Sequence, residues 1–318
     1  MDIFTYIYII SSLGIAILLE GAVIYSKSRQ TQHSEQSILQ DSYIRQIVAM
    51  LFAEESGEIF PHADTAQRRQ ALAEALYSVM SHSYGSDTAT IRGLIERTQL
   101  DKYILIKIRH SKNIERAHYL MLMSAIPTSI PIIPILRPYL YSRYSHTRTA
   151  ALLAILAASP STAISTITSL SYDLTGFDIA RIITLLRRGI LPIAYEPLLS
   201  SQHRNLQMLG LAIVRNFGIE IADKHLQHII SSSADYAVTR EALYTLSSLG
   251  RPLGRVKIRQ RIASMPQHHR KELCRHLTHA GYSLAALRTI FDQNEIQHTE
   301  SIIKSYKRSL ECSYTSNI

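Results

Sequence analysis

The sequence has no tryptophan and only two cysteines, Cys274 and Cys312, among its 318 residues. Two cysteines are too few for a disulfide framework, which favours a reducing compartment. Glycine and proline are also scarce, at 12 and 10 residues, whereas 46% of the chain is hydrophobic. This is the composition of a folding chain and not of a disordered one. Long alternation of apolar and polar residues is missing as well, which favours helices throughout.

Short catalytic and nucleotide-binding patterns are missing too. The sequence contains no G-x-x-x-x-G-K-[ST] phosphate loop, no G-x-G-x-x-G after a strand, no G-x-S-x-G and no H-E-x-x-H. The sequence therefore predicts a protein that is not an enzyme and that needs no cofactor. The formal net charge of +9 points to an anionic partner, such as lipid headgroups, nucleic acid or an acidic protein surface.

The first 26 residues form a long apolar segment. Residues 3–25 carry a single charge, Glu20, and otherwise contain apolar, tyrosine and small side chains. At ~1.5 Å per residue such a helix is long enough to cross a hydrocarbon core of about 30 Å. A cleaved secretory signal is the competing interpretation, but no Lys or Arg precedes the run and no A-x-A site follows it. Residues 1–26 are therefore predicted to be a retained transmembrane anchor.

Charges that flank the segment predict its orientation. Asp2 precedes it, and Lys27 and Arg29 follow it at once. Basic residues are held on the cytoplasmic side. We therefore predict a single-pass protein of an inner or plasma membrane, with its N-terminus outside and its C-terminal domain in the cytoplasm.

Small residues recur on one face of this segment. Ser11, Gly14, Leu18 and Gly21 are spaced by three, four and three residues, which suits close contact with another transmembrane helix. Gly14, Gly21 and the intramembrane carboxylate Glu20 are therefore candidates for contact with a partner's transmembrane helix. The alternative is a plain anchor in which Glu20 reaches the interface.

Beyond a polar linker predicted at residues 27–40, amphipathic helices follow one another with a regular period. Six helices are predicted to end 29 to 32 residues apart, near Pro127, Ser159, Gly189, Gly218, Gly250 and Gly281. The residues ahead of these breaks match. Val238, Ala242, Leu243, Leu246 and Leu249 precede Gly250 at the same offsets as Leu206, Gly210, Leu211, Val214 and Phe217 precede Gly218, and as Thr147, Ala151, Leu152, Ile155 and Ala158 precede Ser159. Such units bury their apolar faces only by stacking.

This pattern resembles the HEAT-repeat superfamily, including its bacterial HEAT-like branch. The segment from Asp235 through Val238 and Arg240 to Leu243 is similar to the family's second helix, except that Thr239 separates Val and Arg. Residues 195–199 and 133–136 resemble its proline-bearing first helix. The resemblance covers residues 112–310 well and residues 41–109 only loosely. It implies an α-solenoid of antiparallel helix pairs that acts by binding along its surface, and it carries no catalytic residue.

The expected fold is therefore all-α, with one transmembrane helix ahead of the solenoid. Residues 41–110 break the period and are predicted to form an atypical N-terminal helical cap, with helices at 88–98 and 101–109. Residues 111–318 hold the HEAT-like repeats, which end in a pair at 284–291 and 295–310.

Basic residues are concentrated between 251 and 275. This window contains eight basic residues and one acidic residue, Glu272, which gives it a net charge of +7. The residues expected to contact an anionic partner are Arg255, Lys257, Arg259, Arg261, Arg270, Lys271 and Arg275. In a helix at 254–264, Ile258, Ile262 and Met265 should form the buried stripe. The open interpretations are a solvated face, an anionic lipid or acidic protein contact, and nucleic acid.

Four side chains on one predicted helix face make a weak metal candidate. His269, Glu272, His276 and His279 fall at i, i+3, i+7 and i+10, and imidazole and carboxylate groups at such spacings can bind zinc or iron. The basic neighbours oppose a cation there, so the prediction for the chain is no bound metal.

The predicted function is a membrane-anchored scaffold or regulator that presents a cytoplasmic HEAT-like solenoid to a partner protein. The resemblance to single-span bacterial HEAT-like proteins implies an integral membrane enzyme, such as a glycosyltransferase, as that partner. The alternative is a nucleic-acid or anionic-lipid binding module that uses residues 251–275. A helical-repeat enzyme is a third possibility, although a base-excising glycosylase would want an aromatic-lined cationic cleft, and the chain has no tryptophan.

Overall fold

The computed structural model describes residues 35–51, 61–82, 88–128, 130–189, 191, 193–297, 299 and 300. Within these residues the chain is all-α, as expected, and contains no strand. It divides between Ser159 and Pro160 into two compact units. The predicted transmembrane anchor lies outside the described residues. Among the described helices, no single one is long and apolar enough to cross a membrane. Only the adjoining segments 145–158 and 160–168, taken together as a bent pair, are long and apolar enough for a membrane span.

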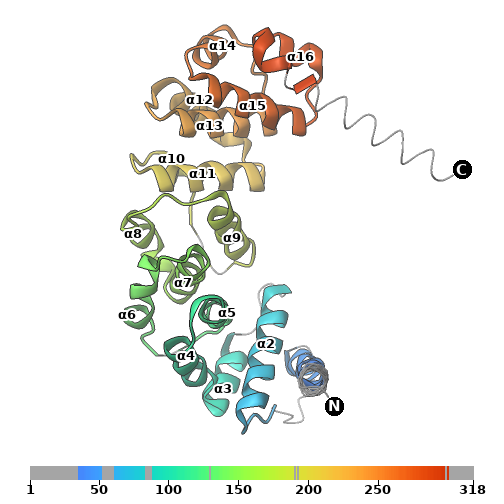
Figure 1. The fold of residues 1–318 in the computed structure, drawn as a ribbon, viewed down its shortest axis with the longest axis vertical. Coiled ribbons are helices and arrows are strands. Elements are labelled where there is room, and N and C mark those ends of the chain that lie inside the picture. Colours follow the sequence, from blue (N-terminus) through green and yellow to red (C-terminus); the bar gives the residue numbers. More distant parts are fainter. Residues whose placement is uncertain are drawn as a thin grey trace, which may run out of the picture. The chain divides into compact units, whose positions relative to one another are not determined.

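The first unit contains a helix over residues 35–51 and the elements that follow it to Ala158 (Figure 1). These are α2 (Ala66–His82), α3 (Thr88–Thr98), α4 (Leu100–His110), α5 (Asn113–Met123), α6 (Ile133–Leu136), the 3₁₀ turn η1 (Arg137–Tyr141) and α7 (Ser145–Ala158). The helix at 88–98 is where the sequence predicts it, and α4 extends the prediction at 101–109 by one residue at each end. Residues 35–40 are helical, so the helical part begins before residue 41 and the predicted linker is shorter than 27–40.

The second unit alternates short and long helices. Its elements are η2 (Pro160–Thr162), α8 (Ala163–Thr168), α9 (Gly176–Arg187), α10 (Glu196–Leu199), α11 (Arg204–Phe217), η3 (Glu220–Ala222), α12 (Asp223–Ser232), α13 (Tyr236–Ser248), α14 (Val256–Ala263), α15 (Gln267–His279) and α16 (Leu284–Arg288). Residues 293–297, 299 and 300 are helical as well. The long helices α11, α13 and α15 are successive neighbours, and the shorter α10 and α12 pack against α11 and α13 (Figure 1).

Glycines terminate the long helices of this unit as the period predicts. Gly189, Gly218, Gly250 and Gly281 all have positive φ, between 63° and 86°. Only glycine adopts this conformation without steric cost. After the last three of these glycines, the next amide donates back to a carbonyl in the last turn of its helix, for example from Arg251 to Leu246 at 3.2 Å. This hydrogen bond belongs to the Schellman motif, which satisfies carbonyls that the helix leaves free.

Most residues of the repeated apolar pattern lie in the core. Val238, Ala242, Leu243 and Leu246 are at most 1% exposed, and the matching residues of α7 and α11 are buried too. The last position of the pattern is the exception, because Phe217 is 47% exposed and Ala158 is also exposed. These residues stand at the helix end, where the chain turns away from the neighbouring helix. A core position there is therefore wrong for Phe217 and Ala158, whereas Leu249 of α13 is partly buried against the core.

Gly210 of α11 lies where α10 approaches that helix closely. A Cβ atom added to it would lie 2.9 Å from Cβ of Leu198 and 3.2 Å from the backbone nitrogen of Leu199, both in α10. No side chain fits at such distances without moving the backbone of α10. The glycine at this position therefore allows α10 and α11 to pack closely.

A recurring arginine joins the two helices of a pair. In α5, α7 and α15 the fourth residue is Arg116, Arg148 or Arg270. Each donates to backbone carbonyls at the end of the preceding helix or turn, for example from Arg116 to Ile108 at 3.0 Å and from Arg148 to Ser142 at 2.9 Å. Cations at a helix C-terminus interact favourably with the free carbonyls. The sequence prediction missed this role, although the common offset is visible in the sequence.

Candidate interaction surface

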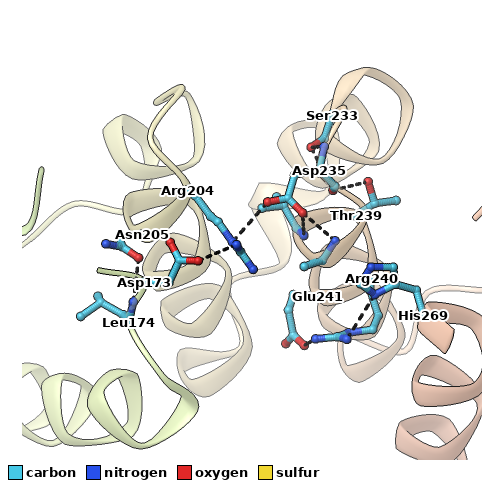
Figure 2. Close-up of polar contacts among 12 residues, drawn as sticks. Asp173, Leu174, Arg204, Asn205, Ser233, Asp235, Thr239, Arg240, Glu241 and His269 are labelled. Carbon is cyan, nitrogen blue, oxygen red and sulfur yellow. Dashed lines mark hydrogen bonds and ion pairs between the residues drawn. The ribbon is translucent and has the colours of Figure 1, made fainter. Parts of the chain in front are cut away.

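Arg204 links the beginnings of successive long helices. It is the first residue of α11, and its guanidinium lies 2.6 Å from the Asp173 carboxylate and 3.2 Å from that of Asp235 (Figure 2). All three side chains are more than a third exposed, so each ion pair contributes at most ~1 kcal/mol. The contact therefore orients the helix ends more than it stabilises them.

Asp235 also caps α13. Its carboxylate accepts hydrogen bonds from the backbone amides of Ala237 at 2.7 Å and Val238 at 3.4 Å. Such an N-cap satisfies amides that have no partner inside the helix and is typically worth ~1 kcal/mol. The same residue, part of the HEAT-like segment in the sequence, thus connects a helix cap to the neighbouring helix through Arg204.

Charged side chains cross the three long helices as one connected row. Arg215 of α11 and Arg240 of α13 bind opposite oxygens of Glu241, at 3.1 and 3.3 Å, and Arg240 also pairs with Glu272 of α15. The side chains of Arg240 and Glu241 are only 18% and 14% exposed. Their mutual attraction is therefore screened less by water than that of a fully exposed pair. We call this row and the aromatic residues beside it the long-helix face.

Tyr244 occupies the centre of the long-helix face. The Arg215 guanidinium lies 4.8 Å from its ring centroid, and the His276 ring meets it edge-on at 4.9 Å. Burial lowers the pKa of His276, and the nearby Glu241 carboxylate opposes this shift. Burial, together with the adjacent His268, also lowers the pKa of His269, which lies 3.4 Å from Arg240. Both imidazoles are thus favoured in the neutral form.

The lowered pKa values of His269 and His276 predict acid sensitivity. The unfolded chain binds protons at these histidines more readily than the folded one. Their contribution to stability is therefore fully present above the unfolded pKa of ~6.5, and it is lost as the pH falls from there through the lower folded pKa values. We expect the urea midpoint of the full-length chain to fall between pH ~7.5 and ~5.5, and to fall less in the His269→Asn, His276→Asn double variant. At pH ~8 both imidazoles are neutral in both states, so the difference there measures packing alone. Equal pH slopes for the two chains would contradict the expectation.

The weak metal candidate is not assembled. Glu272 pairs with Arg240, and His276 contacts Tyr244. His269 is beside Arg240, whose positive charge disfavours a cation. In the part of the chain that the structure describes, no three His, Cys, Asp or Glu side chains come together as a metal site. All four predicted residues lie on α15, at the spacing of one helix face, but they do not come together as a metal site. They are His269, Glu272, His276 and His279.

The basic stretch separates into two kinds of residue. The predicted helix is present as α14, and Ile258, Ile262 and Met265 are buried as expected. Arg261 donates to the carbonyls of Ile230 and Ser233 at the end of α12 and lies over the Tyr236 ring. Arg270 binds the buried Glu295 and donates to the carbonyls of Ala263 and Met265 at the end of α14. These two arginines already have partners within the fold, which leaves them less available to an anionic partner than the sequence suggests.

Five other basic residues are exposed and make no described ion pair. They are Arg255, Lys257 and Arg259 on or at the start of α14, and Lys271 and Arg275 on α15. The sequence could not separate them from Arg261 and Arg270, because all seven fall in one charged run. The transmembrane candidates Gly14, Glu20 and Gly21 lie outside the described residues.

A second polar cluster, in the first unit, was not predicted from sequence. Glu74 of α2 accepts hydrogen bonds from Gln70 at 2.6 Å and from Gln36 at 3.4 Å, and it pairs with His118 at 3.5 Å. The hydrogen bond from His118 is the main cause that lowers the pKa of Glu74. Burial raises the pKa of the neighbouring Tyr119 to about 12. Because the Glu74 carboxylate already has partners from three helices, the cluster fixes these helices to one another.

Comparison with known proteins adds no family to these observations. No protein-family model matches the chain, and no curated protein is significantly similar to it. The class that the fold defines is an all-α protein of packed helices, and the HEAT-like assignment stays a prediction from sequence.

Proposed function

We propose that the chain is a membrane-anchored, HEAT-like α-solenoid that holds or regulates another protein at the membrane. The partner binds on the long-helix face, and an integral membrane enzyme such as a glycosyltransferase is the partner that the family resemblance implies. The observation that carries the proposal is the row Arg215–Glu241–Arg240–Glu272 around Tyr244. It puts fixed charges and an aromatic ring on three successive helices.

The side chains of this face suit protein recognition. Arginine and tyrosine are enriched at the hot spots of protein–protein interfaces, because both side chains combine a large contact area with a directional polar group. Here Arg215, Arg240 and Tyr244 are held by neighbours before any partner arrives. Less conformational entropy is then lost on binding.

The repeated construction supports the solenoid part of the proposal. Helices end on positive-φ glycines about 31 residues apart, a small residue stands at Gly210, and arginines recur between paired helices. These features are expected of stacked repeats. The membrane part rests on the apolar residues 3–25 and on Lys27 and Arg29, which are sequence observations.

Site-specific photo-crosslinking in the native cells tests the proposed partner. Ser248 is exposed on α13, one turn from Tyr244, and accepts a photoreactive phenylalanine without disturbing the core. We expect one discrete crosslink to a membrane protein, and its loss when Tyr244→Ala is added. The same probe at Gln227, exposed on α12, is the matched control and should give no such product. Equal products from both positions would contradict the assignment of the face.

A further inference from the structure

We propose that the outer face of α14 binds an anionic membrane surface through the phosphate groups of acidic lipids. We define the α14 basic face as Arg255, Val256, Lys257 and Arg259, all of which are exposed. This site is distinct from the long-helix face, takes a different ligand, and does not require the N-terminal anchor.

The cations of the α14 basic face make no ion pair with any residue that the structure describes. The helix reads VKIRQRIA and contains no acidic residue. Three carboxylates that contact other arginines of the basic stretch or of α13 are already paired, because Glu295 binds Arg270, Glu272 binds Arg240 and Glu220 binds Arg251. Within residues 251–275, Arg251, Arg261 and Arg270 are thus paired with carboxylates or bound to carbonyls. The remaining positive charge on α14 points to an anionic ligand.

An exposed valine stands among these cations. Val256 is 69% exposed at the first position of α14. At ~100° per residue, Lys257 and Arg259 project on opposite sides of the buried Ile258 stripe, with Val256 between them on the outer surface. Interfacial helices have this arrangement, with basic side chains at the level of the headgroups and an apolar side chain that reaches below them.

The composition of the face favours lipid over the two other anionic partners. Proteins that bind single-stranded nucleic acid stack bases on aromatic rings, and α14 has no aromatic residue. An acidic protein would be recognised best by arginines held in a fixed geometry. Arg255 and Arg259 have no described partner that would fix them, whereas the fixed Arg261 and Arg270 are directed into the fold. Exposed cations without a described partner, grouped around a valine, fit a fluid surface of phosphates.

A fluorescent label on α14 tests the proposal in the full-length chain. The environment-sensitive dye NBD is attached to a cysteine placed at the exposed Gln260, with Cys312→Ser and with the buried Cys274 retained. The protein is reconstituted into bilayers of phosphatidylcholine alone or of equal parts phosphatidylcholine and phosphatidylglycerol. We expect a blue shift, and quenching by nitroxide lipids, only in the anionic bilayer and only at low salt, because the attraction is screened within ~8 Å at physiological ionic strength.

Charge reversal identifies the residues. Arg255→Glu, Lys257→Glu and Arg259→Glu together should abolish the shift and weaken the binding of added anionic vesicles roughly one-hundredfold. Reversal of three exposed basic residues of the first unit, Lys102, Arg109 and Lys112, makes the same change of net charge and should leave the shift in place. The proposal is overturned by a label that stays in water in the anionic bilayer, by equal shifts in both bilayers, or by equal effects of both triple variants. A chain that fails to enter bilayers but binds added anionic vesicles through α14 would contradict the proposed anchor and support this site.

Discussion

Leu246→Asp should lower the free energy of unfolding of the full-length chain by at least ~3 kcal/mol, as measured by urea denaturation followed by circular dichroism. Leu246 is 1% exposed and belongs to the core formed by α11 to α16. An aspartate there loses the packing of the leucine and leaves a carboxylate without a partner in an apolar environment.

The matched control is Ser248→Asp, two residues along the same helix and exposed. It introduces the same charge at a surface position and should change the stability by no more than ~0.5 kcal/mol. A Leu246→Asp chain as stable as the control would show that the assigned inner face of α13 is wrong.

Arg270→Met should destabilise the chain by about 3 to 5 kcal/mol, because it removes the counter-charge of a buried carboxylate. The Glu295 side chain is 1% exposed, and one of its oxygens lies 2.9 Å from both Nε and Nη2 of Arg270. Its other oxygen accepts only the Asp292 amide, at 3.1 Å, among the described contacts. The methionine keeps much of the arginine's apolar stem, so the loss reports the polar contacts of Arg270, which are the ion pair and the hydrogen bonds to two carbonyls.

A double-mutant cycle separates this pair from general damage. Adding Glu295→Met to Arg270→Met removes the stranded charge and should recover most of the lost stability. Arg259→Met, an exposed cation on α14, serves as the control and should be close to neutral. If Arg270→Met behaved like Arg259→Met, then Arg270 would be a surface residue, as the sequence alone predicts.

The helix ends and the inner faces could be predicted from the sequence because local rules determine them. Gly218, Gly250 and Gly281 stop helices through a backbone conformation that other residues adopt only at a cost. The apolar spacing in α13 and α14 determines which side is buried, whatever the partner helix is. Phe217 was wrongly expected in the core, because periodicity does not show where the contact between two neighbouring helices ends.

The candidate surface was less predictable, because its contacts join residues far apart in the chain. Arg270 finds Glu295, 25 residues downstream, and Arg261 finds carbonyls at the end of α12. The run of basic residues in the sequence does not show either of these partners. The row through Glu241 and Tyr244 likewise depends on how α11, α13 and α15 are placed side by side. The HEAT-like segment from Asp235 indicated the helix but not its partners.

The most direct test of the proposed function compares photo-crosslinking from Ser248 in the full-length chain with that in a chain lacking residues 2–25, at equal expression in the native cells. The proposed function requires the anchor to bring the long-helix face to a membrane partner. We expect the full-length chain to give a single Tyr244-dependent crosslink in the membrane fraction, and the shortened chain to be soluble and to lose most of it. A shortened chain that stays in the membrane, or that forms the same crosslink with the same yield, would contradict the proposal.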